Sequence, residues 1–144
     1  MRVADVMTAQ VATARPVDPI RKVASVMANV DSGAVPVVDD GKVVGLVTDR
    51  DIVLRVVAEG GSLDTPVSEV MTGDVQTVTE DTNVADAAGK MASHQIRRLV
   101  VTGEKGNLVG ILSLGDIALD YGAKQVGKTL EEISQEPASD TQAH

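Results

Sequence analysis

The chain contains no cysteine, phenylalanine or tryptophan, and a single tyrosine. Without cysteine it can form no disulfide, no thiolate zinc site and no cysteine nucleophile, and cysteine usage leaves the redox compartment undetermined. Without aromatic side chains it lacks the stacking platforms that proteins offer to single-stranded nucleic acid. A folded core must therefore be built from Val, Ile, Leu, Ala and Met.

The sequence also lacks a basic excess and long apolar runs. Its 13 basic and 21 acidic side chains give a net charge of −8, which disfavours a long nucleic acid or an anionic membrane as a partner. No run approaches the roughly 18 apolar residues of a membrane span, and the first residues show no long apolar region of a signal peptide. We therefore expect a soluble, cytoplasmic protein.

What is present is an internal repeat. The tetrapeptide Asp5-Val6-Met7-Thr8 returns 64 positions later as Glu69-Val70-Met71-Thr72, and the offset becomes 65 by the time Gly45 matches Gly110. The 144 residues, 43% of them hydrophobic, suffice for one compact domain or for two small repeats that share a core. We predict a first repeat at 1–61, a linker at 62–67, a second repeat at 68–121 and a partly disordered extension at 122–144.

Each repeat is predicted to begin with a short extended piece, 11–13 or 75–78, and to continue into a helix. In the first repeat Asp18 has the character of an N-cap, with Pro19 at the first helical position. In the second repeat Thr82 or Asn83 takes the cap. Apolar residues then follow at helical spacing in both copies. Gly89 lies inside the second helix, where it either allows the close approach of another element or is simply tolerated.

A hairpin and a closing helix complete each repeat. Strands at 34–38 and 42–47 flank the turn Asp39-Asp40-Gly41, and the second copy has strands at 98–101 and 108–112. Pro36 indicates that its strand is an edge strand or begins there. The alternation of strands and helices predicts a mixed α/β (α+β) fold made of two β-α-β-β-α repeats.

The most informative motif is Thr48-x-x-Asp51, which recurs as Ser113-x-x-Asp116. Each copy ends an apolar strand and begins a helix. A hydroxyl at a helix N-terminus suits an anion, and a fixed carboxylate three residues later can accept two sugar hydroxyls. The motif therefore suits a nucleotide, with phosphate at Thr48 and ribose at Asp51. The same spacing also describes a capping box with Asp in place of the usual Glu, and the two interpretations are compatible.

Taken together, the Asp-Val-Met-Thr openings, the Val-Pro-Val-Val strand and the repeated Thr/Ser-x-x-Asp resemble a tandem pair of cystathionine-beta-synthase (CBS) domains over residues 1 to about 121. The small stand-alone members of that family are most similar in size and layout. The resemblance implies repeats packed about a pseudo-twofold axis, homodimers, and clefts between the repeats that bind AMP, ADP, ATP or S-adenosylmethionine.

The resemblance also implies the site residues. Thr48 and Asp51, or Ser113 and Asp116, would contact phosphate and ribose, and residues of the early strands would line the adenine. Arginines beside the motifs could meet the phosphate charge, and a solvated surface charge is the alternative for each. The candidates are Val11, Thr13, Ala34, Val35, Thr48, Arg50 and Asp51 at one site, and Val75, Thr77, Arg97, Arg98, Leu99, Ser113 and Asp116 at the other.

The two copies differ in ways that bear on the sites. Val100 stands where the pattern of the family often has the proline matched here by Pro36, which predicts a slight shift of the second strand at the adenine edge. Arg50 lies inside the first motif, whereas Arg97 and Arg98 precede a strand of the second repeat. These differences predict two sites of unequal affinity.

No catalytic or metal-binding set accompanies these motifs. Of the two histidines, His94 is predicted at a helix end and His144 is the last residue, and neither has a neighbour suited to nucleophilic catalysis. Ligands at the spacing of a metal site are missing. We therefore predict a non-enzymatic regulatory module for energy or stress sensing, which binds an adenosine nucleotide and signals to an effector protein. The alternative is a dimerisation or interaction module with vestigial clefts.

Overall fold

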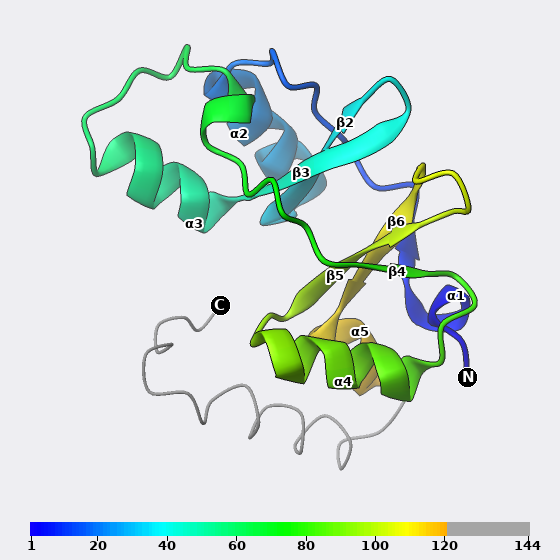
Figure 1. Cartoon of the computed structure of the whole chain (residues 1–144). Coiled ribbons are helices and arrows are strands. Elements are labelled where there is room, and N and C mark those ends of the chain that lie inside the picture. The colour runs from blue at the N-terminus through cyan, green and yellow to red at the C-terminus, as the bar shows by residue number, and fades with distance from the viewer. Residues whose placement is uncertain (121–144) are drawn as a thin grey trace. The chain divides into compact units, whose positions relative to one another are not determined.

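The computed structural model describes residues 1–120 and has a mixed α/β architecture (Figure 1). The predicted fold class is confirmed: each repeat contributes a helix, a pair of strands and a closing helix in the expected order. The predicted extension at 122–144 lies outside the described residues. The helices are α1 (Val3–Val6), α2 (Ile20–Val30), α3 (Asp49–Ile52), α4 (Val84–His94) and α5 (Leu114–Asp120), and the strands are β1 (Thr8–Ala9), β2 (Ala34–Asp39), β3 (Lys42–Thr48), β4 (Thr77–Thr79), β5 (Arg98–Thr102) and β6 (Leu108–Ser113).

The chain forms two compact units that do not follow the sequence repeats. The first-motif unit comprises residues 10–75 and 105–108, and the second-motif unit comprises, among the described residues, 1–9, 76–104 and 109–120. Each unit thus contains most of one repeat together with the opening segment of the other. The repeat boundaries at 61, 68 and 121 remain a prediction from the sequence.

The second-motif unit is built on a four-stranded sheet in the order β1-β6-β5-β4. Strands β4 and β5 run parallel, and α4 forms the crossover between them. Because α4 carries alanines and methionine on one face, it buries that face with the sheet and with α5. The core consists of aliphatic side chains, among them Val84, Met91, Leu99, Leu112 and Ile117.

The first-motif unit is built on the β2–β3 hairpin, whose turn has Asp40 and Gly41 at positive φ. This geometry fits a two-residue turn of the primed type, which Asp-Gly favours. Helix α2 packs its buried residues Ile20, Val23 and Met27 into the core of this unit, together with Val56, Val67 and Val70 from later in the chain. After α3 the chain widens into a π-helical turn at Val53–Val57.

Each unit includes the Met-Thr segment of the opposite repeat. Thr8 pairs with Ile111 of β6 in the second-motif unit, and Thr72 pairs with Leu46 of β3 in the first-motif unit. Glycine at the centre of each receiving strand makes room for this approach. A Cβ on Gly110 would lie 2.5 Å from the Thr8 carbonyl oxygen, and one on Gly45 would lie 3.0 Å from the Thr72 carbonyl oxygen and collide with the Met71 side chain.

Of the two predicted extended pieces, only the one in the second repeat forms a strand, and Pro36 explains the difference. In the second repeat the Val100 amide donates to the Gln76 carbonyl at 3.2 Å, and a parallel strand β4 forms beside β5. The equivalent residue of the first repeat is Pro36, which has no N–H to donate. Residues 11–13 accordingly form no strand, and the chain is bridged to β2 at Ala14.

The predicted cap at Asp18 is wrong by one residue, because Pro19 is the N-cap of α2. Asp18 is 4% exposed, and its carboxylate instead accepts the Arg15 amide at 2.8 Å. Burial would raise the pKa of Asp18, but the Arg15 hydrogen bond and the positive charges of Lys22 and Arg15 together hold it below the ordinary value of 3.8. In the second repeat the prediction of Asn83 as a cap is confirmed, since its side chain accepts the Ala85 amide.

Gly89 makes no close approach to another element, because a Cβ built there meets nothing within 4 Å. Of the two predicted explanations, simple tolerance therefore holds within the described residues.

Candidate functional site

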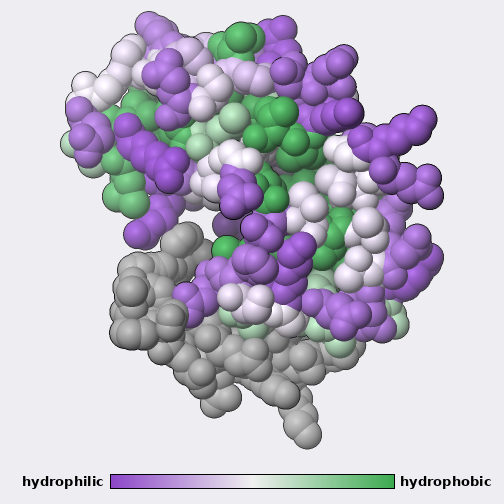
Figure 2. All heavy atoms as spheres, viewed as in Figure 1, coloured by the Kyte–Doolittle hydropathy of each residue, from purple (hydrophilic) through white to green (hydrophobic). Residues whose placement is uncertain are grey.

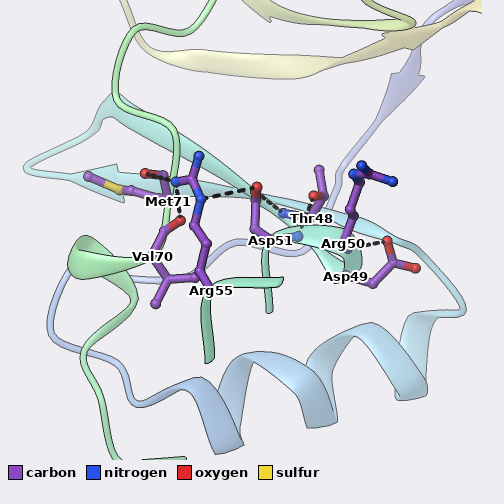
Figure 3. Close-up of polar contacts among 7 residues, drawn as sticks. All are labelled: Thr48, Asp49, Arg50, Asp51, Arg55, Val70 and Met71. Carbon is purple, nitrogen blue, oxygen red and sulfur yellow. Dashed lines mark hydrogen bonds and ion pairs between the residues drawn. The ribbon is translucent and has the colours of Figure 1, made fainter. Parts of the chain in front are cut away.

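The first motif forms a complete capping box where β3 meets α3 (Figure 3). The Thr48 amide donates to Asp51 Oδ2 at 2.9 Å, and the Asp51 amide donates to Thr48 Oγ1 at 3.1 Å. The Asp49 amide, at the first helical position, donates to the Gly33 carbonyl. The structural interpretation of the motif is thus confirmed, and each of these amide donors at the start of α3 has a partner inside the protein.

The second motif repeats this geometry in the other unit. The Ser113 amide donates to Asp116 Oδ2 at 2.9 Å, and the Asp116 amide donates to Ser113 Oγ at 3.0 Å. The Leu114 amide donates to the Arg97 carbonyl, as Asp49 does to Gly33. Two stretches of different sequence therefore hold the same hydroxyl and the same carboxylate in the same arrangement.

The capping box leaves part of each motif available. In Asp51 and Asp116 the cap engages Oδ2, and within the described residues no hydrogen bond is made to Oδ1. The Thr48 and Ser113 hydroxyls accept an amide but keep a proton to donate. Each half-buried motif can therefore still accept a hydrogen bond at a carboxylate oxygen and donate one from a hydroxyl.

The other residues predicted for the first site all lie in the first-motif unit. Ala34 is the register partner of Thr48 across the hairpin. Ala34 and Val35 are buried, and because the Val35 side chain is packed in the core, this residue can offer a ligand only its backbone. Val11 is half-buried and Thr13 exposed, just before the bridge at Ala14.

The residues predicted for the second site are divided between the units. Val75 belongs to the first-motif unit, whereas the structure groups the other six with the second motif: Thr77, Arg97, Arg98, Leu99, Ser113 and Asp116. Leu99 is fully buried in the core, so only its backbone could meet a ligand, while Thr77 and both arginines are half-buried.

The charges around the two motifs are unequal. In the first motif, Asp49 Oδ1 accepts a hydrogen bond from the Arg50 amide at 2.8 Å. Asp49 Oδ2 lies close to Gly33, 3.0 Å from the position that a Cβ on this glycine would occupy. The exposed Arg50 side chain extends away from Asp51 (Figure 3). The second motif has the uncharged Leu114 and Gly115 at these two positions. The first motif therefore carries one acidic and one basic side chain where the second motif carries neither.

Two basic side chains near the predicted residues, those of Arg55 and Lys90, were not among the residues predicted from the sequence. Arg55 lies one helical turn after Asp51, with its Nε 4.0 Å from Asp51 Oδ1. Lys90 reaches from α4 and donates from Nζ to the Thr77 carbonyl oxygen. The spacing of four residues signalled the first contact, whereas nothing in the sequence pointed from Lys90 to Thr77.

His94 is the last residue of α4, as predicted, and its exposed ring lies 3.1 Å from the Lys90 carbonyl oxygen. His144 lies outside the described residues. Residues 1–120 contain no group of three or more acidic or histidine side chains able to hold a metal ion. Across the same range, every helix is too short or too polar to cross a membrane.

This mixed α/β chain, with its two equivalent strand-to-helix motifs, has the organisation of a tandem domain pair. Residues 3–58 and 67–120 match the CBS domain family, and the chain belongs to that family. It is 44% identical over 135 residues to the CBS domain-containing protein YhcV of Bacillus subtilis, an alignment that covers 93% of this chain and 96% of the relative. The resemblance inferred from the sequence is confirmed.

Solved structures of the same family have similar folds. Hypoxic Response Protein I, determined with two coordinated zinc ions, is 31% identical with a TM-score of 0.76 and covers 83% of this chain and 98% of its own. The CBS domain pair of protein MJ0100, in complex with 5′-methylthioadenosine and S-adenosyl-L-methionine, is 30% identical with a TM-score of 0.77, covering 86% and 98%. Protein PAE2072 from Pyrobaculum aerophilum, complexed with AMP, is 29% identical with a TM-score of 0.77, covering 91% and 99%.

Proposed function

We propose that the protein is a non-enzymatic regulatory module that binds an adenosine nucleotide at the Thr48–Asp51 and Ser113–Asp116 motifs. The observation that carries the proposal is that Oδ1 of Asp51 and of Asp116 accepts no hydrogen bond from the described residues and lies next to a hydroxyl that can still donate. At Asp51 this oxygen has only the Arg55 guanidinium nearby among them, with Nε 4.0 Å away. Ribose hydroxyls at the carboxylate and a phosphate at the hydroxyl would use these atoms without breaking the capping boxes. Family members of similar structure, solved in complex with AMP or with S-adenosyl-L-methionine, support the class of ligand.

The finer parts of the proposal concern the ligand and its surroundings. AMP, ADP, ATP and S-adenosylmethionine all carry the adenosine that the two motifs suit. Val11, Thr13, Ala34 and Val35 are proposed to lie against one adenine, with Arg50 near its phosphate. The proposed counterparts at the second motif are Thr77, Arg97, Arg98 and Leu99, whereas Val75 belongs to the other unit and stays a prediction from the sequence. The setting is proposed to be cytoplasmic, with nucleotide level as an energy or stress signal to a separate effector protein.

A homodimer is part of the proposal, and the π-helical turn after α3 offers a surface for it. Val53, Leu54 and Val57 expose between 47% and 63% of their surface there. Figure 2, drawn in the same view as Figure 1, shows hydrophobic residues at the surface on the left, where Figure 1 has α3. Large aliphatic side chains gathered in one turn suit a second apolar surface better than water. Sedimentation of the parent and of a Val57→Glu variant tests this, because a dimer that uses the turn should dissociate in the variant.

Nucleotide binding is tested by isothermal titration with AMP, ADP, ATP and S-adenosylmethionine. The parent is compared with Asp51→Ala and Asp116→Ala, each of which should lose binding at its own motif and keep the other site. The matched control is Asp5→Ala, because Asp5 Oδ2 accepts the Arg2 amide at 2.9 Å in the same way at α1. This control removes a comparable capping bond without touching a proposed ligand site.

The same experiment separates the proposal from its alternative. Ligand at 100 times its dissociation constant should stabilise the parent by about 2.7 kcal/mol, which a thermal shift detects. If none of the four compounds gives heat or a thermal shift, the nucleotide proposal is wrong and an interaction module with vestigial sites is the better interpretation. If both aspartate variants bind as the parent does, the ribose assignment is wrong although binding is real.

A further inference from the structure

Arg55 connects the first motif to the segment that leaves the first-motif unit. Its Nη1 donates to the Val70 carbonyl at 2.9 Å and lies 3.4 Å from the Met71 carbonyl oxygen, and its Nε faces Asp51 Oδ1 at 4.0 Å. Figure 3 shows the guanidinium between the carboxylate and the two carbonyls. One side chain thus links the carboxylate proposed to hold the ribose to the backbone at residues 70–71.

The backbone that Arg55 contacts, at Val70 and Met71, leads directly into a pair of hydrogen bonds with β3. Immediately after Met71, Thr72 exchanges two backbone hydrogen bonds with Leu46 of β3, at 2.9 and 3.0 Å. Three residues further on, at Val75, the chain leaves the first-motif unit and continues at Gln76 in the second-motif unit. A change in how Arg55 holds this backbone would therefore act on one of the segments through which the chain passes from one unit to the other.

A ligand at Asp51 would approach the same carboxylate oxygen that faces Arg55. Oδ2 is committed to the cap, so Oδ1 is the atom that both a ligand hydroxyl and Arg55 can approach. The Arg55 side chain is about half exposed and the Asp51 side chain is largely buried. A guanidinium holds its charge and has five donors, so it can keep its carbonyl contacts while its interaction with the carboxylate changes.

We propose that Arg55 is a positioning residue that couples Asp51 to the Val70–Thr72 segment. Ligand hydroxyls that bind Oδ1 weaken its attraction for Nε, and the guanidinium then interacts more strongly with the Val70 and Met71 carbonyls. Occupancy of the first motif thereby tightens the Thr72–Leu46 pairing. The ligand-dependent part of this inference rests on the proposed function, while the link between Asp51 and Arg55 does not.

Among residues 1–120, no basic side chain makes an equivalent link at the second motif. The residue that corresponds to Arg55 in the second repeat is Asp120, which has the opposite charge. The proposed coupling therefore concerns the first motif, where the sequence has an arginine at this position.

The link is tested by a double-mutant cycle in the full-length protein without ligand. The variants are Asp51→Asn, Arg55→Met and the double substitution, and the measurement is amide hydrogen exchange at Thr72 and Leu46 by NMR. Arg55→Met keeps an apolar stem but loses the donors, so exchange at both amides should rise at least about threefold. Asp51→Asn should change exchange at Thr72 in the parent background and leave it unchanged in the Arg55→Met background.

Controls separate this effect from general destabilisation. Arg21→Met removes an exposed ion pair with Asp64 in the same unit, 3.3 Å between Nη2 and Oδ1, and should leave Thr72 and Leu46 as in the parent. The Ile20 amide, which donates to the Thr65 carbonyl, reports on wider opening of the unit and should not respond to Arg55→Met. Arg55→Lys restores a charge without the fork of donors, and should not restore the coupling to Asp51.

A second arm adds AMP in an Asp116→Ala background, so that only the first motif can bind. AMP should slow exchange at Thr72 when Arg55 is present, and should lose this effect in Arg55→Met at saturating concentration. Additive effects of Asp51→Asn and Arg55→Met in the ligand-free cycle would overturn the inference, whether or not nucleotides bind. Coupling in the cycle together with no AMP binding would instead overturn the proposed function and leave the Asp51–Arg55 link standing.

Discussion

The carbonyl oxygen of Thr8 lies 2.5 Å from the position that a β-carbon on Gly110 would occupy. No side chain fits there unless the backbone of β1 or β6 moves. Gly45 occupies the equivalent place in β3, where a β-carbon would be 3.0 Å from the Thr72 carbonyl oxygen. The backbone of the paired segment therefore excludes a side chain at Gly110, whereas at Gly45 the closest atoms belong to the Met71 side chain.

We predict that Gly110→Ala and Gly45→Ala destabilise the protein by about 1–3 kcal/mol, because each overfills a packed contact. Gly110→Ala should cost more, since at Gly45 the flexible Met71 side chain can take up part of the collision. Gly89→Ala is the control: with open space around it in α4, alanine should be neutral or stabilise by up to about 1 kcal/mol. Urea denaturation measures all three, and equal effects at Gly110 and Gly89 would contradict the packing argument.

A second prediction concerns which fragment of the chain can fold. Residues 10–75 include Val67 and Val70, which are buried in the core of the first-motif unit, whereas residues 1–61 lack them. The shorter fragment also loses the Val67 amide bond to the Asp18 carbonyl. Burying a valine contributes about 1.5–3 kcal/mol, so the loss of two removes much of the stability of so small a unit.

We therefore expect fragment 10–75 to show a cooperative thermal transition and dispersed amide resonances, and fragment 1–61 to show neither. Circular dichroism and a proton–nitrogen correlation spectrum provide the comparison. The reverse order of stability, with 1–61 the better folded, would mean that the sequence repeat rather than the compact unit is the folding unit.

The local elements of the fold could be predicted from the sequence because their signals are local. The Asp39-Asp40-Gly41 turn and the apolar spacing of α2 and α4 depend on neighbouring residues alone. The exchange of Met-Thr segments could not be predicted in this way. Both copies of the segment and both receiving glycines are nearly identical in sequence, so either pairing satisfies the same local pattern, and only the folded chain shows which one forms.

The candidate site divides in the same way. The capping geometry at Thr48–Asp51 and Ser113–Asp116 follows from residue type and spacing, and was predicted as one of two compatible interpretations. The contact of Lys90 with Thr77 depends on how α4 lies against β4, which the periodicity of the helix does not specify. The absence of a strand at 11–13 followed from Pro36, whose missing N–H was visible in the sequence but was considered only for the strand that contains it.

Lowering the pH should decrease the free energy of unfolding, in part because Asp18 becomes protonated. Since its pKa is lower in the folded state than its ordinary value of 3.8, ionised Asp18 contributes stability above that value, and the contribution disappears as the pH falls through the folded pKa. Asp18→Asn should cost about 1–2 kcal/mol at pH 7, and the difference from the parent should shrink below about pH 4.

Urea unfolding at pH 7, 5, 4 and 3 measures this difference, with Asp39→Asn in the exposed hairpin turn as the control. A gap between the parent and Asp18→Asn that stays constant down to pH 3 would show that Asp18 acts through its shape rather than its charge.

The last prediction concerns the unequal motifs. A phosphate bound at Thr48, as proposed, would lie near the Asp49 carboxylate at the start of α3, whereas the second motif has the uncharged Leu114 at the same place. Removing a like charge near a partly exposed site is worth on the order of 1 kcal/mol. Asp49→Asn should therefore raise the affinity of the first motif for ATP about fivefold in an Asp116→Ala background, and the affinity for AMP by less.

Uncharged adenosine should bind the variant and the parent equally in titration calorimetry, because only the phosphates meet the carboxylate. An equal gain for adenosine would show that Asp49→Asn acts on the shape of the site, and no gain for ATP would place the phosphates away from Asp49.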